Sequence, residues 1–404
     1  MKKTIVRMMA ILLAVLSLAH SANLTLLAES AEKINEINVI TEGENDVETP
    51  EGSPILSAKS AILMEANTGT VLYTKNADEA LPPASVTKIM TLLLIMEAID
   101  EGRIKLTDTV TVSANAASMG GSQIYLKEGE QMILEDLLKS VVIASANDAA
   151  VALAEYLYGS VDTFVAKMNQ RANDLGMVNT RFENATGLDD TAVGHLTSAR
   201  DISIMSRELI RHDTILKYSS IWMDTIRDGA FGLTNTNRLV RFYKGCTGLK
   251  TGSTSKAGFC VSVTAERDGM SLICVIMGAE TRDIRNAEAT MLLDWGFSSY
   301  GVFEAPAEEL EAIPVKGGKE DTCKIMSRPF SCVLPKEVIS SVERTVELPG
   351  SISAPVSKGE RIGTVRFRSG EAVIGECEIL SLESVEKINF FEILRRMAAR
   401  FLLV

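Results

Sequence analysis

The chain is organised around Pro82-Pro83-Ala84-Ser85-Val86-Thr87-Lys88-Ile89-Met90-Thr91. The two prolines favour an extended backbone before Ser85, because the residue that precedes a proline is steered away from α geometry. Apolar side chains then recur at helical spacing, which predicts a helix that starts near Ser85 and ends near Gly102. The recurring positions are Ile89, Leu92, Leu93 and Met96.

Ser85 and Lys88 are three residues apart near this helix start, so their side chains share one face and can touch. A serine hydroxyl is a poor nucleophile unless a base takes its proton, and a partly desolvated lysine can be that base. The helix start adds unpaired N–H groups that favour developing negative charge. The spacing alone also fits an ordinary serine beside a solvated lysine, since Ser-x-x-Lys recurs at Ser30/Lys33, Ser253/Lys256 and Ser384/Lys387.

A second motif, Ser145-Ala146-Asn147, lies between helices predicted at 134–143 and 148–158. A hydroxyl there could relay a proton between nucleophile, base and leaving amine. A carboxamide both donates and accepts hydrogen bonds, so it could hold a substrate amide. The alternative is that Asn147 caps the second helix.

The third motif, Lys250-Thr251-Gly252, leads into an alternating apolar run at 259–264. Asp268-Gly269 is typical of a hairpin turn, and a second run returns over 271–278. A lysine and a threonine on a strand can bind a carboxylate, while a glycine lets a ligand backbone approach closely. The alternative is a lysine that merely lies near a turn.

In this order, the three motifs form the set shared by serine β-lactamases and penicillin-binding proteins. The chain resembles the D-alanyl-D-alanine carboxypeptidases of peptidase family S11, the low-molecular-weight penicillin-binding proteins, over about residues 54–382. Further stretches typical of that family are Ser60-Ala-Ile-Leu-Met-Glu-Ala-Asn-Thr-Gly69, Ser118-Met-Gly-Gly-Ser-Gln123, His195-Leu-Thr-Ser-Ala-Arg-Asp201, Leu249-Lys-Thr-Gly-Ser-Thr254 and Asp294-Trp-Gly-Phe297.

The resemblance implies a chemical role for the first two motifs. Ser85 would attack the carbonyl between two terminal D-alanines of a peptidoglycan pentapeptide and become acylated, and β-lactam antibiotics would acylate it as inhibitors. Lys88, kept neutral by burial and neighbouring positive charge, would be the general base. Ser145 would relay the proton to the departing D-alanine, and Asn147 would orient the acyl side chain.

The resemblance also implies a binding role for residues later in the chain. Lys250 would lend positive charge, Thr251 would contact the terminal carboxylate, and Gly252 completes that motif. The backbone N–H groups of Ser85 and Ser253 would form the oxyanion hole. Arg285 matches an arginine that the family places near the carboxylate, and the alternative for it is a surface ion pair.

The fold implied by the resemblance is an α/β catalytic domain of the serine β-lactamase/transpeptidase type over residues 54–303. A five-stranded antiparallel sheet, built from both ends of that domain, would pack between helices. The sequence agrees, since 60–66 and 70–74 alternate around Asn67-Thr68-Gly69, which predicts a hairpin. A helix at about 286–300 would close the sheet. Short runs broken by glycine and proline then predict a small all-β domain over 304–382.

The two ends of the chain predict export and membrane attachment. Basic residues before an apolar run at 8–18 predict a signal peptide over 1–28, with an uncleaved anchor as the alternative, and an acidic linker follows at 29–53. In the tail, 383–404, apolar residues recur at three- and four-residue steps among arginines. We expect an amphipathic helix on the outer face of the cytoplasmic membrane, with a helix docked on its own β domain as the alternative.

Composition counts against other partners. The formal net charge of −12, without basic clusters, argues against nucleic acid. Only three histidines and no metal-binding spacing are present, so we predict neither a metal nor a cofactor. Six cysteines in an exported protein would suggest disulfides. For Cys260 and Cys274 we prefer the interpretation as small buried side chains, because the Asp268-Gly269 turn pairs Cys274 with Val263 instead.

Two other classes of protein share these motifs. A class A β-lactamase adds a Glu-x-x-Leu-Asn segment that activates the deacylating water, and the counterpart at 181–187 reads Arg-Phe-Glu-Asn-Ala-Thr-Gly. The extra β domain is also foreign to those enzymes. A non-catalytic β-lactam-binding sensor would normally be fused to a transmembrane signalling module, and none is visible. The sequence therefore favours a serine carboxypeptidase.

Overall fold

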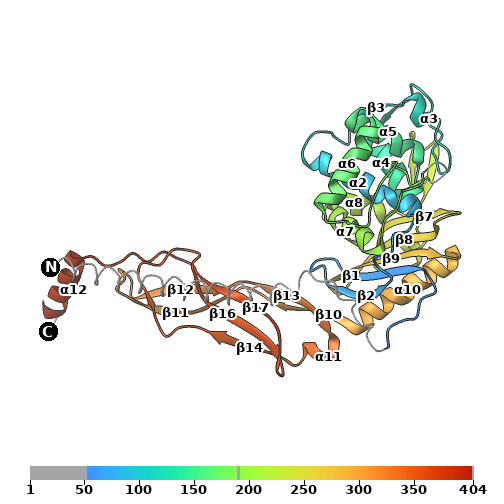
Figure 1. Ribbon diagram of the computed structural model, residues 1–404. Helices are drawn as coiled ribbons and strands as arrows, with labels where there is room; N and C mark the ends of the chain where they lie inside the picture. The colour runs from blue at the N-terminus through green and yellow to red at the C-terminus, as the bar shows by residue number, and fades with distance from the viewer. Residues whose placement is uncertain (1–51, 189–191, 403–404) are drawn as a thin grey trace, which may run out of the picture. The chain divides into compact units, whose positions relative to one another are not determined.

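The computed structural model describes residues 52–188 and 192–402 (Figure 1). The predicted signal peptide, and the acidic linker up to residue 51, lie outside the described residues.

A five-stranded antiparallel sheet forms the middle of the catalytic domain, with the strand order β2-β1-β9-β8-β7. The predicted five-stranded antiparallel sheet is thus confirmed, with strands drawn from both ends of the domain. They are β1 (Ser60–Glu65), β2 (Val71–Lys75), β7 (Cys246–Thr254), β8 (Gly258–Arg267) and β9 (Met270–Ala279).

The register of the β8–β9 hairpin follows from its two-residue turn. Asp268 and Gly269 both have positive φ, of 51° and 77°, as a tight hairpin turn requires. Val263 consequently pairs with Cys274, as the sequence predicts. Cys274 and Cys260 are both fully buried, and all six cysteines, which lie within the described ranges, are free thiols.

The two faces of the sheet carry separate hydrophobic cores. In β9, Ile273 and Val275 belong to the core shared with the helices of the middle segment, whereas Cys274 packs towards α10 (Arg282–Ser299). This alternation is the period of two that a strand covered on both faces must show. Figure 1 shows α10 on one face of the sheet and the helical segment on the other.

The segment between β2 and β7 is mostly helical, and it contains the helices predicted after Ser85, at 134–143 and at 148–158. Its helices are α2 (Lys88–Asp100), α3 (Ala114–Ala117), α4 (Leu134–Ala144), α5 (Asn147–Tyr158), α6 (Val161–Asp174), α7 (Ala199–Leu209), α8 (Asp213–Ser219) and α9 (Leu239–Phe242). Two small hairpins interrupt them, β3–β4 (Thr109–Thr111, Gln131–Ile133) and β5–β6 (Met223–Ile226, Phe231–Thr234). Ser198 caps α7 by accepting a hydrogen bond from the Asp201 backbone N–H.

The C-terminal part is rich in β structure, as predicted. A ribbon of β10 (Tyr300–Ala305) and β13 (Phe330–Pro335) accompanies a six-stranded sheet in the order β14-β16-β17-β12-β11-β15. Those strands are β11 (Glu308–Lys316), β12 (Thr322–Ser327), β14 (Val342–Glu347), β15 (Ile352–Ser353), β16 (Arg361–Ser369) and β17 (Ala372–Ser381), with a short helix α11 (Lys336–Ile339). Phe330 and Phe367 stack at 4.7 Å between ring centroids in its core.

Candidate active site

The predicted Ser85 helix is two elements in the structure. A 3-10 helix, η1 (Ala84–Thr87), carries Ser85, and the α-helix proper, α2, begins only at Lys88. On the other side, Ala84 has a φ of +49° in the left-handed region, so no helix extends backwards beyond this turn. Because side chains three residues apart eclipse in a 3-10 turn, Ser85 and Lys88 still meet. Their Oγ and Nζ atoms are 3.0 Å apart.

Two glycines allow other segments to pack directly on this turn. A Cβ atom on Gly252 of β7 would come within 2.8 Å of the Ser85 backbone nitrogen, so no side chain fits there. A Cβ on Gly187 would lie 1.8 Å from the Ala84 carbonyl oxygen, and Gly187 itself has a φ of +80°. Glycine at both positions is therefore a steric requirement of the nucleophile turn.

A buried histidine supports the same turn from behind. His195 accepts a hydrogen bond at Nδ1 from the Glu183 backbone N–H, so Nε2 is left to carry the proton of a neutral ring. Nε2 then donates to Thr87 Oγ1 at 2.7 Å, and Thr87 donates onward to the Ala84 carbonyl at 2.8 Å. The sequence singled out this histidine only as part of a family stretch, without a role.

Lys88 is fully buried and has three hydrogen-bond acceptors. Besides Ser85 Oγ, its Nζ contacts Asn147 Oδ1 at 2.6 Å and the Thr186 carbonyl at 2.8 Å. Burial lowers the pKa of Lys88 well below its usual value, and the positive charge of Lys250 lowers this pKa further. A lysine in this setting can stand neutral and accept a proton from the adjacent hydroxyl.

Ser145 and Lys250 form a second pair facing the first. Ser145 ends α4 in the left-handed conformation, with a φ of 62°, and its Oγ accepts a hydrogen bond from Lys250 Nζ at 2.8 Å. Lys250 is also buried and donates to the Thr251 carbonyl at 2.9 Å. Burial lowers the pKa of Lys250 to about 7, with the charge of Arg285 as the second cause.

Asn147 is fully engaged inside the protein. It is the first residue of α5, and its Nδ2 donates to the Gly120 carbonyl at 2.7 Å while Oδ1 accepts from Lys88. Only 2% of the residue is exposed. Ala146 is the N-cap of α5 and makes no side-chain capping bond, so Asn147 is not a helix cap. Its amide orients the amine of Lys88 in this structure.

An open pocket of about 650 Å³ lies against these groups. Of the predicted site residues, Ser85, Ser145, Thr251, Gly252, Ser253 and Arg285 line it, whereas Lys88, Asn147 and Lys250 lie behind its wall. The sequence did not identify its other lining residues, which are Ser122, Trp222, Thr234, Asn235, Thr236, Arg238, Phe242 and Arg282. Ser122 alone lay in a stretch already quoted for the family resemblance.

Arg285 lies at the pocket edge on α10. It is 2% exposed, and it donates to the Cys260 carbonyl and to Asn286 Oδ1, so it is not a surface ion-pair residue. The helix that carries it begins at Arg282, four residues before the predicted start, because Thr281 caps it by accepting from the Ile284 N–H. Within 52–188 and 192–402, no group of three His, Cys, Asp or Glu side chains could hold a metal ion.

Comparison with known proteins identifies the family. The profile described as D-alanyl-D-alanine carboxypeptidase matches residues 46–281, and that of the penicillin-binding protein 5 C-terminal domain matches residues 298–387. The chain is 44% identical over 346 residues to D-alanyl-D-alanine carboxypeptidase DacF of Bacillus subtilis, covering 84% of this chain and 88% of that one.

Solved structures agree with this comparison. Penicillin-binding protein 5 from Haemophilus influenzae superposes with a TM-score of 0.73 at 32% identity, over 83% of this chain and 99% of that one. Penicillin-binding protein D2 from Listeria monocytogenes, solved in its ampicillin-bound form, gives 0.56 at 33% identity over 60% and 98%. The chain therefore belongs to the D-alanyl-D-alanine carboxypeptidases of peptidase family S11, the low-molecular-weight penicillin-binding proteins. It is a serine carboxypeptidase that acts on peptidoglycan.

Proposed function

We propose that this carboxypeptidase removes the terminal D-alanine from pentapeptide stems through an acyl-enzyme on Ser85. The contact between the fully buried Lys88 Nζ and Ser85 Oγ, at 3.0 Å on the pocket wall, carries the proposal. The lowered pKa of Lys88 supports its role as general base, because only the neutral amine can accept the hydroxyl proton.

In the acylation step, Ser85 Oγ forms a bond to the carbonyl carbon between the two D-alanines while Lys88 takes the hydroxyl proton. The backbone N–H groups of Ser85 and Ser253 stabilise the oxyanion. The C–N bond then breaks, and Ser145, held by Lys250 at 2.8 Å, relays the proton to the leaving amine. Water next attacks the ester on Ser85, which releases the tetrapeptide and restores the hydroxyl.

We assign the terminal carboxylate of the substrate to the part of the pocket that Thr251 and Arg285 line. Thr251 lines the pocket together with Arg285, and its hydroxyl contacts Thr236 Oγ1 at 2.8 Å. A hydroxyl beside a guanidinium suits a carboxylate. We assign Asn147 the task of holding Lys88, since both ends of its amide are occupied.

Incubation with a purified pentapeptide muropeptide tests the activity directly. Mass spectrometry should show loss of one alanine from the stem and release of free D-alanine. A product of cross-linked stems without free tetrapeptide would contradict the carboxypeptidase assignment.

β-Lactams are proposed to acylate Ser85 and to leave it slowly. Ampicillin is bound in the Listeria relative, and no carboxylate lines the pocket within the described ranges. Glu183, in the stretch that corresponds to the β-lactamase water-activating segment, accepts hydrogen bonds from the backbone of Val193 and Gly194. We predict that the penicilloyl adduct, followed by intact-protein mass spectrometry, outlives the peptide acyl-enzyme. Rapid multiple-turnover hydrolysis of penicillin would instead indicate a β-lactamase.

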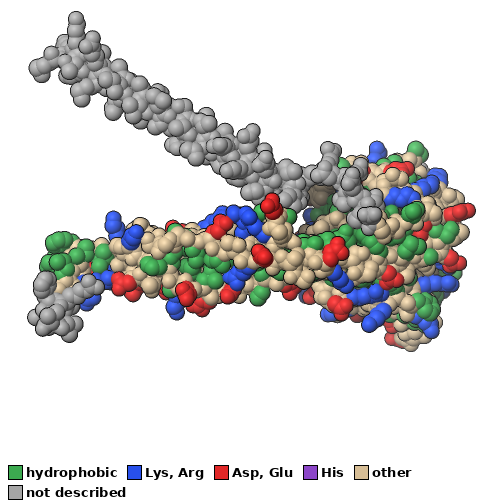
Figure 2. All heavy atoms as spheres, turned by 90° about the horizontal axis from the view of Figure 1, so that it is seen from below, with side chains coloured by type: hydrophobic (Ala, Val, Ile, Leu, Met, Phe, Trp, Pro, Cys, Tyr) green, Lys and Arg blue, Asp and Glu red, His purple; other side chains and the backbone are tan. Residues whose placement is uncertain are grey.

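The last helix, α12 (Phe390–Leu402), is proposed to lie on the membrane surface. Hydrophobic side chains gather at this end of the C-terminal domain (Figure 2), and Phe390 and Phe391 are 71% and 80% exposed. Arg396 contacts Asp321 of the β domain, but Phe391, Leu394 and Met397 of α12 remain exposed. Among the described residues, no helix is both long and apolar enough to cross a bilayer. Exposed aromatic residues among arginines suit the headgroup layer of an anionic membrane, here its outer face.

Truncation should start later than the predicted tail boundary at 383. Val385 is 1% exposed and pairs with Val356 of the β domain, so residues 383–388 belong to that domain's packing. We predict that deletion of 390–404 leaves activity on soluble pentapeptide intact but releases the enzyme from the membrane fraction. Phe391→Glu should weaken sedimentation with membranes, and Val373→Glu, at an exposed apolar residue of β17, should not. A truncated protein that still sediments would exclude α12 as the principal anchor.

A further inference from the structure

The segment 120–126 connects the pocket wall to the proposed general base. Ser122 lines the pocket, and its carbonyl accepts the Asn147 backbone N–H at 2.7 Å. The Gly120 carbonyl accepts Asn147 Nδ2 at 2.7 Å. Because Asn147 Oδ1 accepts from Lys88, the position of this segment fixes the amide that orients Lys88.

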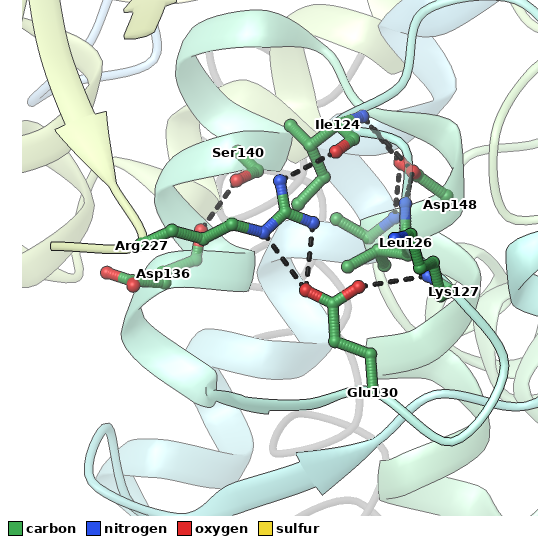
Figure 3. A network of polar contacts seen from close by, with 9 residues as sticks. Ile124, Leu126, Lys127, Glu130, Asp136, Ser140, Asp148 and Arg227 are labelled. Atoms are coloured by element: carbon green, nitrogen blue, oxygen red, sulfur yellow. Dashed lines mark hydrogen bonds and ion pairs between the residues drawn. The ribbon is translucent and has the colours of Figure 1, made fainter. Parts of the chain in front are cut away.

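Asp148 holds the segment from inside. The residue is 0% exposed, and its carboxylate accepts the backbone N–H groups of Ile124 at 3.1 Å and Leu126 at 3.0 Å (Figure 3). Tyr125 between them has a φ of +58°, which turns both N–H groups towards one carboxylate. The Ala149 N–H donates to the same group at 2.9 Å. The carboxylate therefore ties two backbone N–H groups of the segment to the start of α5.

Arg227 holds the same segment from the opposite side. Its Nη1 donates to the Ile124 carbonyl at 2.9 Å, and its Nε and Nη2 contact Glu130 at 3.0 and 2.9 Å. Glu130 in turn accepts the Lys127 backbone N–H at 2.9 Å. Figure 3 shows Ile124 between the two charged groups, its N–H towards Asp148 and its carbonyl towards Arg227. Arg227 itself lies at the β5–β6 turn with a φ of +53°.

We propose that Asp148 and Arg227 are positioning residues for the carboxypeptidase reaction: together they fix segment 120–126, and through Asn147 they fix the amine of Lys88. This inference rests on the proposed function of Ser85 and Lys88. Neither residue lines the pocket, and both act through a backbone segment whose first residues belong to the family stretch 118–123.

The charge of Asp148 adds an effect that packing alone would not produce. The charged groups that act on Lys88 are Lys250 from β7, which lowers its pKa, and Asp148 from α5, which raises it. Without the negative charge of Asp148, the pKa of Lys88 falls further. Acylation needs the neutral amine, so the acid limb of its pH profile should then move to lower pH.

The first experiment measures the rate of acylation by fluorescent penicillin against pH for the wild type and Asp148→Asn. We expect the acid limb to move to lower pH and the plateau to fall by about tenfold. A role confined to stability would lower the plateau and leave the limb in place. Melting temperature and hydrogen exchange of the Ile124 and Leu126 amides, measured on the same samples, report whether the variant folds and whether the segment loosens.

The second experiment compares two matched arginines. Arg227 and Arg171 are 26% and 25% exposed, and each bonds glutamate, Arg171 pairing with Glu97 and Glu208 away from the segment. We expect Arg227→Gln to slow acylation by about tenfold and Arg171→Gln to stay within about twofold. Arg227→Lys, which keeps a cation near the Ile124 carbonyl, should recover part of the rate.

The outcomes separate this inference from the proposed function. The proposed function is supported if penicillin labels Ser85 of the wild type and the acylation rate falls at acid pH, whatever the variants do. An unmoved limb in folded Asp148→Asn overturns the role of Asp148, and equal rates for Arg227→Gln and Arg171→Gln overturn that of Arg227. If Asp148→Asn does not fold, the arginine comparison alone decides whether the segment positions the site.

Discussion

Ser85→Ala is expected to lose covalent labelling by penicillin altogether and to release D-alanine at least about 10⁴-fold more slowly than the wild type. The physical reason is that Lys88 Nζ lies 3.0 Å from Ser85 Oγ and has no other hydroxyl within its three contacts. Fluorescent penicillin on a gel, with mass spectrometry of the labelled peptide, measures the first effect. Chromatography of released D-alanine measures the second.

A matched control comes from the same sequence pattern elsewhere. Ser384 also precedes a lysine by three residues, but its Oγ accepts a hydrogen bond from the Lys358 backbone in the C-terminal domain. Ser384→Ala should therefore label and turn over like the wild type. If Ser85→Ala still carries penicillin, the nucleophile has been assigned to the wrong residue.

Lys88→Arg should lose nearly all acylation while it keeps the positive charge. A guanidinium does not deprotonate in proteins, so it cannot take the Ser85 proton. In the wild type, the lowered pKa makes the neutral amine available, and the acylation rate should rise with pH as Lys88 loses its proton. That rise should be absent from the variant. Stopped-flow acylation across pH measures both effects, and circular dichroism checks the fold.

Lys75→Arg serves as the control for introducing an arginine. Lys75 is a partly buried lysine of β2 whose Nζ donates to the Leu56 carbonyl at 2.6 Å, and the substitution should leave acylation unchanged. Acylation of Lys88→Arg at the wild-type rate would mean that another group is the base.

Local patterns predicted those parts of the fold that local chemistry determines. The Asp268-Gly269 turn set the β8–β9 register down to the pairing of Val263 with Cys274. Apolar periodicity placed α4 and α5 within a residue of their observed starts at Leu134 and Asn147. The three motifs predicted which residues meet, because each motif sits on an element that the sheet and helices bring to the same pocket.

Tertiary contacts determined what the sequence did not predict. The 3-10 turn at Ser85 exists because Gly187 and Gly252 press their backbones on it, and neither contact has a local signature. Trp222 reaches the pocket from the loop before β5, and Phe242 reaches it from the short helix α9; neither segment carries a strong periodicity. Asn147 faces Lys88 because segment 120–126 occupies its other side, and that segment forms neither helix nor strand.

The strand order also dictates when the catalytic domain can form during synthesis. β1 is made near the start of the domain, yet its neighbour in the sheet, β9, is made near the end, with Ser60 opposite Met277. Until then the β1 edge of the first hairpin is unpaired, and closing the long loop between β1 and β9 is slow. A chain that stops before Met270 lacks β9, so the β1 edge stays unpaired. Such an exposed strand edge makes the chain prone to aggregation and proteolysis. Completion of the sheet and completion of the active site are thus the same event, since β7, which carries Lys250, reaches β1 only through β8 and β9.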